Sequence, residues 1–239
     1  LDRIGFEGTP RVDVATLTQI QQRHLLTIPY ENISVQLSEP VGLAPGPIFE
    51  KIVHGDRGGW CYEMNGLMQW ALQEIGFDVM RMAGGVMRSA IGDIALGNHL
   101  VLAVQLDEVW IADVGFGDGC KAPFPLCDGT ITEQGLRFSL RRLEDGFWRF
   151  GSHQFSSTTD FDFETVSADE ELLEAQCHHL QSAEDSPFVA TLVCQKHEPA
   201  AIQTLRGRVR STISGAGVTR WVVDSPAELN DELAETFGI

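Results

Sequence analysis

Residues 57–66 read RGGWCYEMNG and place one cysteine, Cys61, directly after two glycines and a tryptophan. Cys61, Met64 and Met68 recur at the spacing of one helical face, and Gly76 stands where a C-cap glycine belongs. The pattern predicts a tight glycine turn that opens a helix with Cys61 in its first turn. Unpaired N–H groups at a helix start stabilise a thiolate, so Cys61 is a candidate nucleophile. The alternative is a buried structural cysteine, the common state of free cysteine.

The composition limits the class of protein. The chain has 239 residues, of which 43% are hydrophobic, enough for one large domain or two to three small ones. A net charge of −17 excludes binding to nucleic acid or to an anionic membrane through the bulk field of the protein. No apolar run reaches the roughly 18 residues that a membrane span needs.

The termini and cysteines indicate the compartment. The first residues, LDRIGFEGTP, are mixed and polar, unlike a secretory signal, and without an initiator methionine we expect a few residues to precede them. The five cysteines form no CxxC pair. An odd number of widely spaced cysteines predicts free thiols in a reducing cytoplasm and no metal site.

The periodicity changes twice along the chain. The first third is helical: Asp13 is an N-cap candidate for a helix that Pro29 ends, and residues 46–53 predict a short helix. The middle third has the period of strands at 79–87, 99–106 and 108–116, and Asp145–Gly146 predicts a hairpin turn. The last third mixes a helix over 169–181, strands around 189–194 and 201–206, and a closing helix that starts at Ser225. The sequence therefore predicts an α+β protein with boundaries near residues 80 and 180.

A nucleophilic thiol needs a base and a group that orients it. Of seven histidines, His99 alone opens an apolar strand, and the next strand ends at Asp113. If Gln105 faces Val109 across a three-residue turn, Asp113 lies opposite Val101, one same-face step from His99. A slip of one residue would turn Asp113 to the other face, so the sequence permits a His99–Asp113 pair without requiring it.

These residues carry a family resemblance. The segments RGGWCYEMN (57–65), NHLVLAV (98–104) and IADVGFG (111–117) resemble the arylamine N-acetyltransferases, which have RGGxCxxxN, a histidine that opens a strand, and an aspartate in D-[VA]-G-F-G. Further similar segments follow in the same order, including LLTIPYENISVQL, ALQEIGFDV and SPFVATLVC. The resemblance covers essentially the whole chain.

The resemblance implies a fold and an activity. The expected fold is α+β and multidomain, with a helical bundle over 1–80, a β-barrel over 81–180 and an α/β lid over 181–239. The expected activity is transfer of an acetyl group from acetyl-CoA, the co-substrate, to an arylamine or arylhydrazine by a ping-pong route. A triad of Cys61, His99 and Asp113 would form the acetyl-cysteine intermediate.

The resemblance also implies binding residues. Phe116 and Val86 match positions that line the acceptor pocket, and the coenzyme A contacts are carried over to Gly115, Gly117 and Phe188. Arg57 and Glu63 are expected to pair, and Asn65 to support the loop. One departure is Asp118, which puts a negative charge into a glycine loop that is expected near phosphates.

Three other functions share these features. An amide synthase that forms macrolactams would use the same triad with an acyl group from a carrier protein. A cysteine amidase or transglutaminase-like enzyme would also use Cys-His-Asp. A binding module with a disabled site is the alternative outside catalysis, although intact Cys61, His99 and Asp113 argue against it.

Overall fold

The N-terminal part of the chain is helical, as its periodicity predicts. The computed structural model describes residues 1–239, and its first long helix, α1, is Val14–Thr27. Asp13 caps α1, because its carboxylate accepts a hydrogen bond from the N–H of Thr16 at 2.7 Å. The short helices α2 (Ile33–Gln36) and α3 (Pro45–Phe49) follow, and a π-helical turn (Glu50–His54) extends α3.

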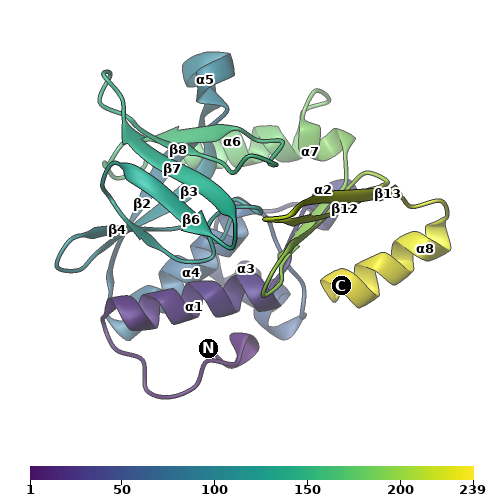
Figure 1. Cartoon of the computed structure of the whole chain (residues 1–239), viewed down its shortest axis with the longest axis horizontal. Helices are drawn as coiled ribbons and strands as arrows, with labels where there is room; N and C mark the ends of the chain where they lie inside the picture. Colours follow the sequence, from purple (N-terminus) through teal and green to yellow (C-terminus); the bar gives the residue numbers. More distant parts are fainter.

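Helix α4 (Cys61–Ile75) is the central helix of the molecule (Figure 1). Its first eight residues are all buried, and Met64 and Met68 pack in one apolar core with residues of α1. Gly76 ends α4 with a φ of 107°, which a glycine adopts without strain. The predicted start and end of this helix are confirmed.

The middle of the chain forms an eight-stranded antiparallel sheet that curls into a nearly closed barrel. The strand order is β5-β4-β3-β2-β9-β8-β7-β6, so β5 and β6 are its two free edges. Aromatic rings fill the interior, among them Phe138, Phe150 and Phe161. The strands are β2 (Asp78–Val86), β3 (Leu96–Gln105), β4 (Val109–Ala112), β5 (Phe124–Pro125), β6 (Gly129–Glu133), β7 (Leu136–Arg142), β8 (Trp148–Gly151) and β9 (Asp160–Phe163).

The register of β3 and β4 is the one that the sequence predicts. Gln105 pairs with Val109, and the ladder continues to Leu102 opposite Ala112. Residues 100–104 are at most 4% exposed, because the barrel interior covers one face of β3 and α4 and α6 cover the other. The register brings His99 and Asp113 to the same end of the two strands.

The connection between β2 and β3 projects from the barrel as α5 (Arg88–Ile91) and a 3-10 turn (Gly92–Ala95), visible at the top of Figure 1. Arg88 fixes this connection to neighbouring residues. Its guanidinium donates hydrogen bonds to carboxylates of Asp93, Asp145 and Asp162 and lies 3.8 Å from the ring centre of Phe147.

The last third forms a smaller antiparallel sheet in the order β1-β10-β11-β12-β13. Its first strand, β1 (Tyr30–Glu31), comes from the N-terminal part of the chain and pairs with β10. The other elements are α6 (Glu170–Ser182), α7 (Pro187–Ala190), β10 (Val193–His197), β11 (Ile202–Arg206), β12 (Val209–Ser214), β13 (Gly217–Val222), α8 (Pro226–Asp231) and a π-helical turn (Glu232–Phe237).

The strand predicted around residues 189–194 starts earlier than the observed strand. Residues 189–194 are not all extended, because Ser186 caps the short helix α7 by accepting a hydrogen bond from the N–H of Phe188. Pro187 occupies the first helical position, where proline is favoured. Strand β10 therefore begins at Val193. The predicted helix over 169–181, the strand ending at Arg206 and the closing helix are confirmed.

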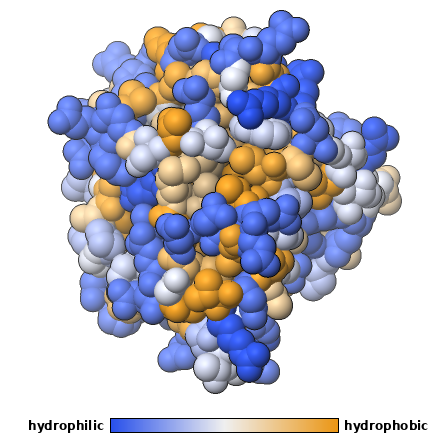
Figure 2. All heavy atoms as spheres, turned by 90° about the vertical axis from the view of Figure 1, so that its left-hand side faces the viewer, coloured by the Kyte–Doolittle hydropathy of each residue, from blue (hydrophilic) through white to orange (hydrophobic).

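The architecture is α+β: helices below and beside a nearly closed barrel, with the smaller sheet at one side (Figure 1). No helix is long and apolar enough to cross a membrane. Figure 2 shows orange apolar patches between hydrophilic side chains on one face, which is usual for a protein surface. The boundaries near 80 and 180 remain predictions.

Two buried histidines make stability depend on pH. Burial, the largest cause in both, lowers the pKa of His24 from 6.5 to about 3 and that of His197 to about 4. The unfolded chain takes up these protons near pH 6.5, whereas the folded chain does not. Their contribution to the free energy of unfolding is therefore fully present above pH 6.5 and falls as the pH drops towards 4.

We expect each histidine to lower the free energy of unfolding by about 2 kcal/mol between pH 7 and pH 5. His24→Leu should remove its share of this dependence, and His54→Leu, at an exposed position, should not. Urea denaturation at the two pH values measures the difference. The same pH dependence in the wild type and in His24→Leu would contradict the assignment.

Candidate active site

The turn before α4 packs closely against β1. The N–H of Glu31 donates a hydrogen bond to the carbonyl of Gly59 at 2.9 Å, and the N–H of Gly59 donates to the carbonyl of Pro29. A Cβ atom at Gly58 would collide with the Pro29 carbonyl, and one at Gly59 would lie 2.8 Å from a carboxylate oxygen of Glu63. Glycine is required at both positions because of this close approach.

A buried network of charges supports the same turn. Lys51 Nζ lies 2.9 Å from a carboxylate oxygen of Glu63, and the guanidinium of Arg57 lies 2.9 Å from Glu31. The expected pair of Arg57 with Glu63 is therefore wrong. Glu31 takes that place because β1 runs directly beside the glycine turn. Burial raises the pKa of Glu63, and the ammonium of Lys51 opposes this.

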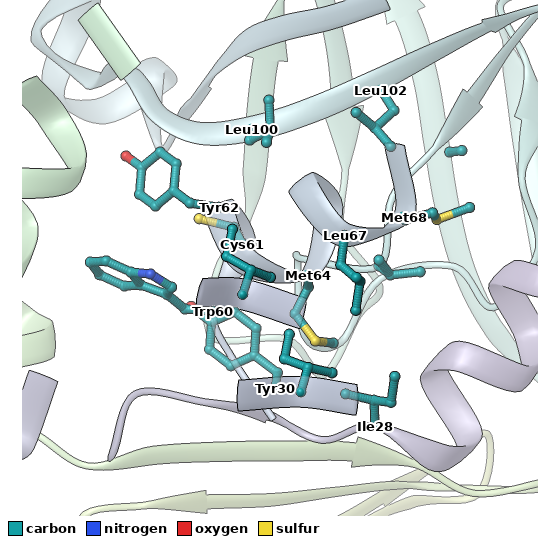
Figure 3. Close-up of a cluster of buried hydrophobic side chains, with 14 of the residues drawn as sticks. Ile28, Tyr30, Trp60, Cys61, Tyr62, Met64, Leu67, Met68, Leu100 and Leu102 are labelled. Carbon is teal, nitrogen blue, oxygen red and sulfur yellow. The ribbon is translucent and has the colours of Figure 1, made fainter. Parts of the chain in front are cut away.

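Cys61 occupies the first position of α4 and is only 3% exposed. Figure 3 shows the rings of Trp60 and Tyr62 beside it. Its Sγ lies 3.9 Å from the carbonyl oxygen of Asn98, the residue before His99. Burial raises the pKa of the Cys61 thiol, and backbone N–H groups oppose this only in part. The expected depression by the helix start is therefore outweighed by desolvation, and a thiolate here needs a base beside it.

His99 and Asp113 are in contact. The distance from His99 Nε2 to Asp113 Oδ2 is 2.8 Å, and the two side chains are 2% and 8% exposed. Since an ionised carboxylate only accepts hydrogen bonds, the ring proton of neutral His99 belongs on Nε2. The other ring nitrogen, Nδ1, is then free to accept a proton.

Asn65 ties Asp113 to α4, one helical turn after Cys61. Its Nδ2 donates hydrogen bonds to Asp113 Oδ1 at 2.8 Å and to the carbonyl of Leu100 at 2.6 Å, and its Oδ1 accepts from the N–H of Val114. The expected supporting role of Asn65 is confirmed. Through it, the helix that carries Cys61 is fixed to the strands that carry His99 and Asp113.

The two residues matched to an acceptor pocket lie near His99. The ring of Phe116 meets the ring of His99 edge-on, with centres 5.7 Å apart. Val86 is half-buried at the end of β2, where its N–H donates to Asn98 Oδ1 at 2.7 Å. Asn98 thus links the Val86 segment to the strand of His99. Sequence reasoning missed this link, whose only signal is a polar residue directly before the histidine.

The three residues matched to coenzyme A are Gly115 and Gly117, in the loop after β4, and Phe188, on α7. Gly115 packs directly on Cys61, and Gly117 has a φ of 85° in the following turn. Phe188 on α7 meets Trp60 edge-on at 5.3 Å. Gly115 and Phe188 therefore lie near the start of α4, whereas Gly117 faces the side chain of Gln195.

Comparisons with known proteins agree with this arrangement. The sequence model of the N-acetyltransferase family matches residues 13–239. The arylamine N-acetyltransferase of Mycolicibacterium smegmatis is 32% identical over 248 residues, which cover 100% of this chain and 90% of that protein. Human arylamine N-acetyltransferase 1 is 28% identical over 87% of this chain and 79% of its own length.

Solved structures are equally similar. The Mycobacterium marinum arylamine N-acetyltransferase superposes with a TM-score of 0.90 at 28% identity, covering 100% of this chain and 91% of that one. The structure of that enzyme in complex with CoA gives a TM-score of 0.89 at 27% identity, with the same coverage. This chain belongs to the arylamine N-acetyltransferase family, whose members are acyltransferases.

The packing of Gly115 gives a sharp test of the site geometry. An added Cβ would lie 2.6 Å from Cα of Cys61 and 2.7 Å from Nδ2 of Asn65. We expect Gly115→Ala to lower the free energy of unfolding by about 3 kcal/mol, the cost of overpacking a filled site. Gly119→Ala is the matched control, because its nearest neighbour is Cβ of Phe116 at 3.4 Å. Equal stability of the two variants in urea denaturation would show that the loop does not press on α4.

Proposed function

We propose that this protein transfers the acetyl group of acetyl-CoA to arylamines and arylhydrazines by a ping-pong mechanism through acetyl-Cys61. The observation that carries the proposal is the His99–Asp113 hydrogen bond of 2.8 Å, joined through Asn65 to the helix start that holds Cys61. Membership of the family supports the reaction, and the relative solved with CoA supports the donor.

In the proposed first half-reaction, Asp113 holds His99 in the tautomer with the proton on Nε2. Nδ1 takes the proton of the Cys61 thiol as Sγ attacks the thioester carbonyl. The C–S bond to coenzyme A breaks, and the CoA thiolate leaves with the proton returned from His99. Because burial raises the pKa of the thiol, the thiolate is stable only as an ion pair with the imidazolium.

In the second half-reaction the amine attacks the acetyl-cysteine while His99 accepts its proton, and Cys61 regains a thiol. An amine is a better nucleophile than water, and the burial of Cys61 and His99 shelters the thioester from hydrolysis. We propose that Phe116 and Val86 contact the acceptor, and that Gly115, Gly117 and Phe188 contact coenzyme A. We propose that residues 181–239 act as a lid over this site.

The test is to follow acetylation of Cys61 by mass spectrometry after mixing with acetyl-CoA, at several pH values. The wild type should gain one acetyl group on the peptide that contains Cys61, at and below the ordinary thiol pKa of about 8.5. His99→Asn should be acetylated only at higher pH, because burial raises the thiol pKa and no base removes the proton. Acetylation of another cysteine, or none in the wild type, would refute the proposal.

A substitution at Phe116 distinguishes contacts to the acceptor from contacts to the donor. An aromatic acceptor packed on its ring gains roughly 0.5–1.5 kcal/mol beyond area burial. We therefore expect Phe116→Ser to slow deacylation by aryl amines several-fold and acylation by acetyl-CoA much less. Equal losses in the two half-reactions would show that Phe116 only supports the triad. An acetyl-enzyme that no aryl amine deacylates would favour a macrolactam-forming amide synthase.

A further inference from the structure

The loop that carries Phe116 is held from inside the barrel by polar groups that the proposed reaction does not use. Asp118 and His153 are 5% and 3% exposed, so the carboxylate of Asp118 turns into the barrel instead of towards solvent. Its Oδ2 lies 3.5 Å from Nε2 of His153. His197, on β10, lies 3.0 Å from the carbonyl oxygen of Gly117 through its Nε2.

The tautomer of His153 is set by its other nitrogen. Nδ1 accepts a hydrogen bond from the N–H of Phe155 at 3.2 Å, so the ring proton of the neutral imidazole is on Nε2. That N–H faces Asp118 Oδ2 but makes no hydrogen bond with it. The ring of Phe138 meets His153 edge-on at 5.4 Å and limits its movement. At 3.5 Å the contact is long, and the interaction is chiefly between the charge and the N–H dipole.

The two ends of this loop are thus fixed by two buried carboxylates. Asp113 accepts hydrogen bonds from His99 and from the N–H of Gly115 at the first end. At the other end, the carboxylate of Asp118 lies beside the ring of His153. Phe116 lies between them in the sequence, and its ring contacts both His99 and Phe161, whose rings also contact each other.

We propose that Asp118 and His153 are positioning residues for the acceptor: by anchoring the loop inside the barrel they hold the Phe116 ring beside His99. They touch neither the donor nor the reacting atoms. This inference rests on the proposed function, because it assigns the acceptor contact to Phe116. It also gives the inward charge of Asp118 a role that does not involve the phosphates of the donor.

The experiment compares both half-reactions in Asp118→Ala with those in Asp107→Ala, which removes an exposed carboxylate from the turn between β3 and β4. Asp118→Ala should raise the KM for an aryl amine about 2- to 10-fold, the value of one aromatic contact. Acylation of Cys61 by acetyl-CoA should change much less, because Asp113 holds Gly115 and His197 contacts Gly117 independently of Asp118. Asp118→Asn keeps the size of the side chain and removes its charge, so it should raise the acceptor KM in the same direction as Asp118→Ala.

A double variant tests whether the effect passes through Phe116. If Asp118 acts by placing that ring, Asp118→Ala should raise the acceptor KM by less than about twofold in the Phe116→Ser background. His153→Phe keeps a ring between its neighbours and removes both the N–H that faces Asp118 and the Nδ1 that accepts from Phe155, so it should reproduce Asp118→Ala. This variant decides the matter if Asp118→Ala does not fold.

An unchanged acceptor KM in Asp118→Ala or His153→Phe would overturn the inference. So would equal losses in both half-reactions, or full additivity with Phe116→Ser. Each of these results leaves acetylation of wild-type Cys61 intact, and so leaves the proposed function standing. Absence of acetylation in the wild type would instead remove the proposed function itself.

Discussion

The carboxylate of Asp113 is the interaction on which the site depends. Oδ2 accepts a hydrogen bond from His99, and Oδ1 accepts from Asn65 and from the N–H of Gly115, each at 2.8 Å. Its own N–H donates to Gln21 Oε1 on α1. The carboxylate therefore joins α4, the barrel and the glycine loop, and the backbone N–H of Asp113 adds α1. These three donors offset part of the cost of burying the carboxylate, and the contact leaves His99 one defined tautomer.

Burial has opposite effects on the hydrogen bonds of Asp113 and on a thiolate at Cys61. It strengthens the hydrogen bonds around Asp113, because water does not compete for them. It also makes an isolated Cys61 thiolate unfavourable, as the raised thiol pKa indicates. The strong hydrogen bonds around Asp113 and the weak acidity of the Cys61 thiol therefore have one cause, which is burial of the core at the start of α4. In the proposed reaction a cation formed at His99 would offset the cost of the thiolate, which would make His99 as important as Cys61.

Local signals predict much of this structure. The N-cap at Asp13, the span of α4 and the register of β3 with β4 depend on residues close together in sequence, and all three agree with the structure. The partner of Arg57 was not predictable, because Glu31 belongs to a two-residue strand whose neighbour, β10, lies far along the chain. The start of β10 was misplaced although Ser186–Pro187 repeats the signal of Ser225–Pro226. Strands β12 and β13 were missed although two-residue turns with glycine, Gly207–Arg208 and Gly215–Ala216, join them into hairpins. The inward turn of Asp118 depends on tertiary packing and had no local signal.

The pairing of β1 with β10 also orders the events of folding. Tyr30 pairs with Gln195 and Glu31 with Cys194, across more than half of the chain. Closing so long a loop costs conformational entropy that only late contacts repay. During synthesis, α4 and the barrel strands leave the ribosome before β10 exists, so the glycine turn at Cys61 first lacks the sheet behind β1. Cys61 is therefore among the first residues made and among the last to reach its final surroundings.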